Sequence, residues 1–370
     1  MSNYPLVSVK DIVKIHYGKA LRTKDRVESG SIPVFGANGQ IGFHDVPLID
    51  FPTLVIGRKG SAGEVTYTDC GGWVIDTAFY TEINKPDETD LRYLFYALKR
   101  SNLEKLTITT AIPGVNRDSL YGKKIPLPPL EEQKRIAAIL DRADAVRRKR
   151  FEAIALTEEL LRSTFLDMFG DPVTNPKGWN TGKLSEVCDR VTDGTHQSPQ
   201  WSTEGVPFLF VSNIVDGEIN FKVSKYITED CWKSLTARCP IELNDILYTT
   251  VGSYGNAALV RTATKFCFQR HIAHIKPNHK KVNPEFLLGL MQSPGIKNQA
   301  DRQVRGVAQK TFNLRELKNF EIFIPPRSEQ DKYVSIRRKV EGSLDSYREC
   351  CDTQDYFFNS LLQKAFRGEL

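Results

Sequence analysis

The sequence predicts an α+β protein in which two mixed α/β domains stand in tandem and each is followed by a long helix. We expect the two helices to pair as an antiparallel coiled coil with pseudo-two-fold symmetry. Three observations support this fold class: a block of sequence that occurs twice in the 370 residues, a charged segment with helical periodicity after each copy, and β-rich runs before each copy. The predicted domains are 1–129 and 173–326, and the predicted helical spacers are 130–172 and 327–370.

The repeated block sets these boundaries. Residues 125–133 read IPLPPLEEQ and residues 322–330 read IFIPPRSEQ, so two prolines, a glutamate and a glutamine align at an offset of 197. Gly60-Ser61-Ala62-Gly63 also matches Gly252-Ser253-Tyr254-Gly255 at an offset of 192. Preserved order with a drifting offset indicates a duplication followed by changes in loop length.

Short β-rich runs bounded by Gly, Pro, Asn and Asp fill the two globular segments. The expected runs are Thr53–Gly57, Gly63–Tyr67, Val74–Ile83, Pro207–Val211, Ile246–Val251 and Asn256–Val260. Helices are expected at Asp90–Arg100 and Pro284–Gln292, which occupy matching places in the two halves.

The charged segments have the apolar spacing of helices, in steps of three and four residues. The stripe of the first segment is Ile136, Ile139, Leu140, Ala143, Val146, Ala153, Ile154, Leu160, Leu161, Phe165 and Met168. Pro129 and Pro326 permit a helix to start, and Gly170 ends the first one. A lone helix of roughly 40 residues cannot bury its stripe, so we expect the two stripes to pair. The alternative is that each helix packs only on its own domain.

Charge and composition favour a soluble protein that meets an anion. The net charge of +6 lies entirely in the globular segments, and both helical segments are neutral. No apolar run is long enough to cross a bilayer, no signal peptide is evident, and we expect no membrane partner. Seven cysteines without a C-x-x-C pair favour reduced thiols in a cytoplasm.

Catalytic motifs are missing from the sequence, and we expect no catalytic residue and no metal site. There is no G-x-x-x-x-G-K-[ST] phosphate loop, and Asn175-Pro176-Lys177-Gly178 lacks the second proline and the aromatic residue of an amino-methyltransferase. Glu316-Leu317-Lys318 imitates part of a nuclease motif, but Asn313 before it is typical of a helix N-cap.

Two further groups of side chains leave alternatives open. His271 and His274 lie three apart in a strand-like run, so they point to opposite faces and are expected to face solvent or DNA rather than to bind metal. Arg147-Arg148-Lys149-Arg150 and Arg337-Arg338-Lys339 lie within the predicted helices. They either contact phosphates or an acidic partner, or they form ion pairs along the helix, such as Arg148 with Asp144.

The exposed loops are rich in the side chains that contact DNA. Glycines in a loop let the backbone approach a phosphate, and Arg, Gln and Asn make paired hydrogen bonds to base edges. The candidates in the first half are Asn38, Gln40, Arg58, Lys59, Ser61, Asn116 and Arg117. Those in the second half are Thr195, His196, Gln197, Ser253, Tyr254, Asn256, Gln269, Arg270, His271, Arg302, Arg305, Gln309 and Lys310. The alternative for each one is an ordinary solvated loop residue.

Together these segments resemble the specificity (S) subunit of type I restriction-modification enzymes. The residues that carry the resemblance are IPLPPLEEQKRIAAIL and its repeat, DGTHQSP, FLFVSNI-x-x-G-x-I, DILYTTVGSYGN, LKNFEIFIPP and the AFRGEL ending. The resemblance covers nearly the whole chain, but the first half has no equivalent of DGTH.

The resemblance implies two target-recognition domains that each read one half of a bipartite sequence in double-stranded DNA. It implies two modification subunits that carry S-adenosylmethionine and methylate adenine, and restriction subunits that use ATP and Mg²⁺, with no cofactor bound by this chain. Two alternatives stay open: a stand-alone DNA-modifying enzyme with a divergent active site, and a coiled-coil protein scaffold.

Overall fold

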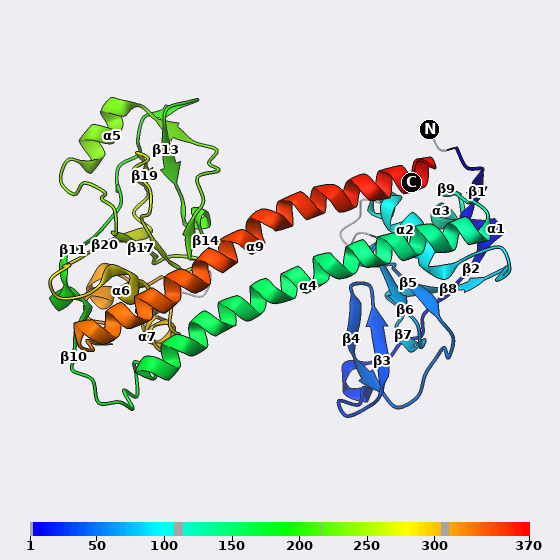
Figure 1. Cartoon of the computed structure of the whole chain (residues 1–370), viewed down its shortest axis with the longest axis horizontal. Helices are drawn as coiled ribbons and strands as arrows, with labels where there is room; N and C mark the ends of the chain where they lie inside the picture. The colour runs from blue at the N-terminus through cyan, green and yellow to red at the C-terminus, as the bar shows by residue number, and fades with distance from the viewer. Residues whose placement is uncertain (1–2, 107–113, 216, 305–310) are drawn as a thin grey trace. The chain divides into compact units, whose positions relative to one another are not determined.

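The structure is a computed structural model that describes residues 3–106, 114–215, 217–304 and 311–370 (Figure 1). It divides into two compact units: unit 1 is Met1–Glu152 with Arg348–Leu370, and unit 2 is Ala153–Tyr347. Each unit holds one globular segment and a part of both long helices, α4 (Leu130–Phe169) and α9 (Arg327–Arg367). The domain boundaries drawn from the sequence therefore stay a prediction.

Among the described residues, the globular part of unit 1 contains three sheets and three short α-helices. Its elements are β1 (Leu6–Ser8), α1 (Val9–Ile12), β2 (Val13–Tyr17), β3 (Ile32–Gly36), β4 (Gly39–His44), β5 (Thr53–Gly57), β6 (Val65–Thr68), β7 (Trp73–Val74), β8 (Ala78–Ile83), α2 (Leu91–Arg100), α3 (Arg117–Tyr121) and β9 (Lys124–Pro126). The sheets have the strand orders β2-β8-β5-β6, β4-β3-β7 and β1-β9.

The globular part of unit 2 is larger. Its elements are β10 (Thr181–Lys183), β11 (Cys188–Asp193), β12 (Trp201–Ser202), β13 (Val206–Leu209), β14 (Ile214–Val215), β15 (Glu218–Ile219), β16 (Tyr226–Ile227), α5 (Glu229–Thr236), β17 (Ile246–Thr249), β18 (Ala257–Leu259), β19 (Cys267–Phe268), β20 (Ile272–Pro277), α6 (Pro284–Met291), α7 (Pro294–Gln303), α8 (Leu314–Lys318) and β21 (Glu321–Phe323). Its sheets have the orders β11-β20-β17-β18, β12-β16-β13-β19, β14-β15 and β10-β21.

The two units share one topology, as the sequence repeat predicts. In unit 1 the antiparallel pairs are β2 with β8, β8 with β5 and β5 with β6, and unit 2 repeats them with β11, β20, β17 and β18. A parallel pair, β3 with β7 or β13 with β19, belongs to a second sheet in each unit. The run expected at Val74–Ile83 is therefore two strands, because the chain turns after β7 and enters the other sheet as β8.

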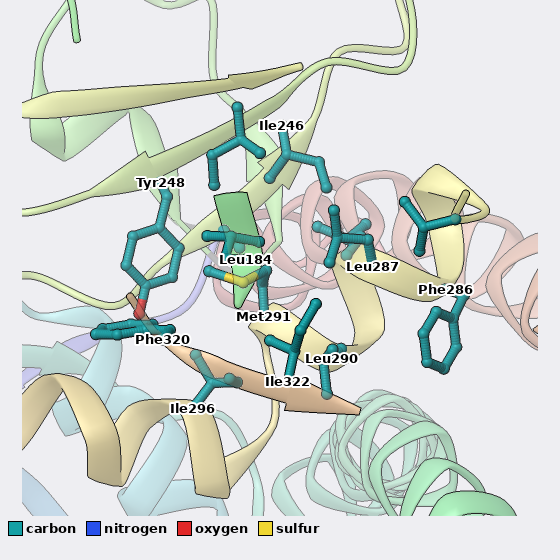
Figure 2. Packing of buried hydrophobic residues seen from close by; sticks show 14 of the residues in the cluster. Leu184, Ile246, Tyr248, Phe286, Leu287, Leu290, Met291, Ile296, Phe320 and Ile322 are labelled. Atoms are coloured by element: carbon teal, nitrogen blue, oxygen red, sulfur yellow. The ribbon is translucent and has the colours of Figure 1, made fainter. Parts of the chain in front are cut away.

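In each unit the main core lies between one four-stranded sheet, β2-β8-β5-β6 or β11-β20-β17-β18, and the helices. In unit 1, Leu54 and Ile56 of β5 belong to one buried cluster with Tyr93 of α2, Ile136 of α4 and Phe366 of α9. Figure 2 shows the corresponding core of unit 2, where side chains from β17, α6 and β21 converge. Both cores contain residues from both long helices, so each helix stabilises both globular parts.

The long helices run antiparallel in each unit. In unit 1, Arg147 of α4 lies 3.5 Å from Asp355 of α9, and Arg135 donates a hydrogen bond to the carbonyl of Leu370 at 3.0 Å. In unit 2, Phe165 near the end of α4 packs on Tyr333 near the start of α9, with ring centroids 5.3 Å apart. The predicted antiparallel pairing is confirmed, and each helix also contributes side chains to the cores of both units.

Part of the predicted apolar stripe does not face this pairing. Val146 and Leu160 of α4 are each 52% exposed, whereas Ile136, Leu140 and Phe165 are buried. The side chains next to the globular cores are buried because both the sheet region and the partner helix cover them, and the stripe opens to solvent where the domains end. None of the helices among the described residues combines the length and the hydrophobicity that a membrane span requires.

The glutamine of the repeated block ties each long helix to its domain. Gln133 accepts a hydrogen bond from the backbone N–H of Asp90 at 2.9 Å and donates to the carbonyls of Pro128 and Glu88, both at 2.8 Å. Gln330 repeats this pattern with the N–H of Asn283 and the carbonyl of Pro325, both at 2.8 Å. Asp90 and Asn283 are the N-caps of α2 and α6, so one side chain fixes where two helices begin.

Replacement of Gln133 or Gln330 by Met should destabilise the protein. Methionine keeps the volume but leaves a backbone N–H and carbonyl groups without partners, at a cost of about 1–3 kcal/mol for each buried polar group left unsatisfied. Denaturant unfolding measures the loss. Gln363→Met, at an exposed position of α9, is the matched control and should leave the unfolding midpoint unchanged. Equal midpoints for all three variants would contradict this role.

Candidate nucleic-acid interface

The candidate loops of the two units share one backbone frame. In unit 1, the loop after β5 is closed by hydrogen bonds from Gly57 N to the carbonyl of Glu64 and from Gly63 N to the carbonyl of Gly57, both 2.8 Å. In unit 2, the loop after β17 has the equivalent bonds from Thr249 N to Asn256 and from Gly255 N to Thr249, both 2.9 Å. The offset of 192 found in the sequence thus marks one hairpin geometry that carries different side chains.

A second shared feature is a glycine turn at the end of β2 and of β11. Gly18 N donates to the carbonyl of Ala78 at 3.1 Å, and Gly194 N donates to that of Ile272 at 3.2 Å. A Cβ at either glycine would lie 2.1–2.2 Å from a backbone carbonyl oxygen, so only glycine fits. The expectation that the first half lacks an equivalent of DGTH is therefore wrong for the backbone, because Tyr17-Gly18-Lys19 takes the place of Asp193-Gly194-Thr195.

In unit 1 this turn brings together residues that are distant in the sequence. Tyr17 is 49% exposed, and the guanidinium carbons of Arg58 and Arg117 lie 5.0 and 5.3 Å from the centre of its ring. Arg58 also donates to the carbonyl of Asp76 at 3.1 Å. Two cations held on one exposed aromatic ring form a site suited to the phosphates of a nucleic acid. Both arginines were predicted as candidates from the sequence, but Tyr17 was not.

The other candidates of unit 1 surround this site or support it. Asn38 and Gln40 are exposed at the tip of the β3–β4 hairpin. This hairpin lies close to the start of the loop after β5, as a Cβ added to Gly57 would lie only 2.6 Å from the carbonyl oxygen of Ala37. Lys59 is exposed, and its backbone forms an isolated bridge to Gly114. Ser61 is half-buried in the same loop. Their contacts with a ligand stay a prediction.

Asn116 has a structural task that the sequence analysis assigned only to its repeat partner. Its side-chain oxygen accepts from the N–H of Ser119 at 2.7 Å and caps α3, as Asn313 caps α8 by accepting from the N–H of Glu316 at 3.1 Å. The carboxylate of Glu316 in turn accepts from the N–H of Asn313 at 2.8 Å. This capping box gives Glu316 a structural role at the start of α8, so the nuclease-like pattern Glu316-Leu317-Lys318 does not require a catalytic explanation.

In unit 2, the glycine turn joins two candidate loops. Arg270 N donates to the carbonyl of Thr195 at 3.1 Å, and Thr195 forms a parallel bridge with Gln269. The side-chain hydroxyl oxygen of Thr195 accepts a hydrogen bond from the backbone N–H of Gln197 at 3.1 Å. His196 bonds to the carboxylate of Asp193 at 2.8 Å. The structure thus places the candidates 195–197 and 269–271 in one cluster, which we term the turn cluster.

Charge in the turn cluster comes from Arg270, which is exposed. Burial, followed by the positive charges of Arg270 and His196, lowers the pKa of His271 below its ordinary value. The backbone carbonyl of His271 accepts from Thr250 N at 2.9 Å. This last bond connects the turn cluster to the loop after β17.

The loop after β17 is anchored on α7. Tyr254 donates its hydroxyl hydrogen to Asp301 at 2.7 Å, and the ammonium of Lys297 lies 3.5 Å from the centre of the Tyr254 ring. Asn256 donates to the carbonyl of Ser253 at 3.0 Å and closes the turn. Tyr254 and Asn256 thus fix the conformation that presents the exposed Ser253.

Arg302 is exposed at the end of α7 and lines a polar hollow of about 560 Å³ with Gln303 and Arg315. Arg305, Gln309 and Lys310 lie outside the described residues. Most described candidates of unit 2 are linked through the turn cluster, the loop after β17 or α7.

His274 does not face solvent or DNA, contrary to expectation. It is buried, with Nε2 2.6 Å from Oδ2 of Asp245 and Nδ1 3.4 Å from Sγ of Cys239. Lys276 donates to the same Asp245 oxygen at 2.9 Å. Although burial alone would raise the pKa of Asp245, the hydrogen bonds from His274 and Lys276 outweigh it and lower the pKa. Among the described residues, no group of three or more His, Cys, Asp or Glu side chains could hold a metal ion.

The arginine clusters of the long helices form ion pairs within the protein. Arg148 lies 3.1 Å from Asp144, as the spacing predicts, and Arg147 also pairs with Asp144, at 2.8 Å. Arg337 is buried beside Glu341 at 2.7 Å, and Arg338 pairs with Glu285 at 2.5 Å. These contacts favour the ion-pair alternative over binding of phosphates.

Comparisons with known proteins agree with this arrangement. The family described as "Type I restriction modification DNA specificity domain" matches residues 1–160 and 176–345. The specificity subunit of the Escherichia coli type I restriction enzyme EcoBI is 28% identical, over 99% of this chain and 80% of that protein. A specificity subunit of the type I enzyme MjaVIII from Methanocaldococcus jannaschii is 24% identical, over 79% of this chain and 75% of that protein.

The fold also resembles that of a solved structure. The S subunit of a type I restriction-modification system from M. genitalium superposes with a TM-score of 0.63 and 17% identity, over 99% of this chain and 96% of that chain. At this identity the likeness concerns the fold alone.

Replacement of Asp245 by Asn should destabilise unit 2 near neutral pH, by about 1–3 kcal/mol, because the acceptor of a buried charge-assisted hydrogen-bond network loses its negative charge. Since the pKa of Asp245 is lowered on folding, its stabilising effect is present above about 3.9, the ordinary pKa of an aspartate, and is lost as the pH falls through the lower folded value. The difference in melting temperature between wild type and Asp245→Asn should thus be constant toward neutral pH and shrink below about pH 4.

The control is Glu242→Gln. Glu242 pairs with the same Lys276 at 2.8 Å, but its side chain is 66% exposed, so its removal should cost under about 1 kcal/mol. An Asp245→Asn variant as stable as Glu242→Gln would contradict the structural role of the buried cluster.

Proposed function

The chain belongs to the type I restriction modification DNA specificity family, and from this membership we propose that it is the subunit that reads the DNA target of a type I restriction-modification complex. It recognises a bipartite sequence in double-stranded DNA, and it directs adenine methylation and DNA cleavage by partner subunits. The observation that carries the proposal is the family match to both halves of the chain, each of which has the same backbone frame with different exposed side chains.

The two frames supply different contacts. In unit 1, Arg58 and Arg117 on Tyr17 place positive charge beside a glycine-rich loop, which suits a backbone phosphate. In unit 2, the turn cluster presents Gln269 and Arg270, whose side chains make paired hydrogen bonds to adenine and guanine edges. Because the frames match and the side chains differ, each unit reads its own half of the target.

The chain is not the catalyst of the complex. We propose that two modification subunits bind S-adenosylmethionine and transfer its methyl group, and that restriction subunits bind ATP and Mg²⁺. The relatives are named specificity subunits, and Glu316, the acidic residue of the nuclease-like Glu316-Leu317-Lys318, forms a helix cap. A complex that protects chromosomal DNA acts in the cytoplasm, where we place this chain.

The purified chain should therefore show no methyltransferase, nuclease or ATPase activity. Addition of the modification subunits and S-adenosylmethionine should give methylated adenine at one bipartite sequence, which sequencing of modified DNA detects. Methyl transfer by the chain alone would favour a stand-alone enzyme, and an assembled complex without any sequence preference would favour a protein scaffold.

Substitutions at the two frames should have different effects. Arg58→Ala with Lys59→Ala should weaken binding to all sequences about equally and reduce the salt dependence, because phosphate contacts are lost. Arg270→Ala or Gln269→Ala should relax the choice of base in one half of the target, by about 1–3 kcal/mol per lost contact. The same result is predicted for Arg305 and Gln309.

Binding of the assembled complex to a library of DNA sequences separates the two effects. Arg22→Ala is the control for unit 1, because Arg22 is exposed and pairs locally with Asp25. If every variant changed affinity and none changed sequence preference, the assignment of reading residues to the turn cluster would be wrong.

A further inference from the structure

Trp201 differs from the other three tryptophans of the chain. The indole N–H groups of Trp73, Trp179 and Trp232 donate to backbone carbonyls at 2.9, 3.0 and 2.9 Å. The N–H of Trp201 has no acceptor within the residues that the structure describes, and Trp201 is 44% exposed. Since an indole ring with a free N–H is both apolar and a hydrogen-bond donor, it is typical of a surface that meets a partner.

The ring of Trp201 is held in one orientation although it is exposed. It packs edge-on against Phe208 with centroids 5.0 Å apart, and it is nearly parallel to Phe210 at 6.4 Å. The ammonium of Lys225 lies 4.4 Å from the ring centre. A fixed aromatic ring loses little conformational entropy on binding, and the lysine gives this surface a positive charge.

This aromatic surface is continuous with the turn cluster. Strands β13 and β19 are parallel, and Gln269 N donates to the carbonyl of Leu209 at 3.2 Å. Phe210, which lies nearly parallel to Trp201, therefore follows directly after a residue bonded to Gln269. Thr195 N also donates to the carbonyl of Phe268 at 3.1 Å, so both loops of the cluster are hydrogen-bonded to this sheet.

We propose that Trp201 and Lys225 form a DNA-contacting platform of unit 2, beside the bases that the turn cluster reads. The indole ring packs on a nucleotide, its N–H donates to an oxygen of that strand, and Lys225 pairs with a phosphate. The platform fixes the position of unit 2 along the DNA, and it contacts the DNA without selecting a base. The inference rests on the function proposed above and extends it to residues outside the predicted loops.

Binding measurements on the assembled complex test the platform. Trp201→Ala should weaken binding to target and non-target DNA alike, about tenfold, as for the loss of one aromatic stacking contact. Trp201→Phe should lose less, because it keeps a smaller aromatic ring for stacking while it lacks the N–H. Lys225→Met should lower the dependence of log K on log salt concentration by about one unit.

Trp232→Phe is the matched control. Trp232 also carries a lysine ammonium over its ring, that of Lys265 at 4.9 Å, but its N–H bonds to the carbonyl of Phe266. This variant should bind DNA like the wild type. If the wild-type complex binds its target and the Trp201→Ala and Trp232→Phe complexes bind DNA with equal affinity, the platform is overturned and the proposed function is left intact.

Photochemical cross-linking covers the case in which Trp201→Ala does not fold. DNA with 5-iodouracil or 5-iodocytosine at each pyrimidine in and beside the second half-site is irradiated with the wild-type complex, and cross-linked peptides are identified by mass spectrometry. A cross-link at Trp201 is expected. Cross-links confined to other residues of unit 2 would overturn the platform, and a wild-type complex without sequence-specific binding would overturn both proposals.

Discussion

The buried glutamine amide at the start of each long helix is the constraint on which the rest of the structure depends. Gln133 and Gln330 are almost completely buried, at 0% and 1% exposure, and each joins the Pro-Pro turn, the N-cap of a domain helix and the first turn of α4 or α9. A primary amide can donate and accept at once, which neither a carboxylate nor a methionine can do. This bond therefore fixes the helix start relative to the sheet that carries the recognition loops.

Recognition follows from a duplicated backbone with different side chains. The glycine turn and the hairpin loop have the same hydrogen bonds in both units, so both present side chains at equivalent places. In unit 1 those places carry Tyr17 and Arg58, whereas in unit 2 they carry Asp193 and the buried Thr250. A conserved frame with variable contacts lets one architecture read two unrelated half-sites, because backbone bonds define the position and side chains define the sequence.

Regular and repeated features of the fold could be predicted from the sequence. The helical stripes and the offset of 197 are properties of the sequence itself, and they predict α4, α9 and the common topology. The burial of His274 could not be predicted, because strand periodicity separates the faces of His271 and His274 but does not say which face Asp245 and Cys239 cover. Val146 and Leu160 have helical spacing, yet their exposure depends on where the domains end.

The candidate site was predictable only in part for the same reason. Arg58 and Arg117 are visible as basic loop residues, but Tyr17 joins them through sheet pairing of distant segments. Asn116 and Asn313 are equivalent in the repeat, but a helix cap was predicted only for Asn313, and the geometry shows that Asn116 caps a helix as well. Trp201 lies in a two-residue strand, and that its N–H has no acceptor among the described residues is evident only by comparison with the three bonded tryptophans.

The central claim is that each half of the chain reads its own half of the target, and an exchange of domains tests it most directly. Residues 173–326 are replaced by the corresponding residues of a relative with a known, different target, and the hybrid is assembled with its modification subunits. Sequencing of methylated adenines then reports the site. The account predicts that one half-site changes to that of the donor and that the other is retained. A change in both half-sites, or in neither, would contradict it.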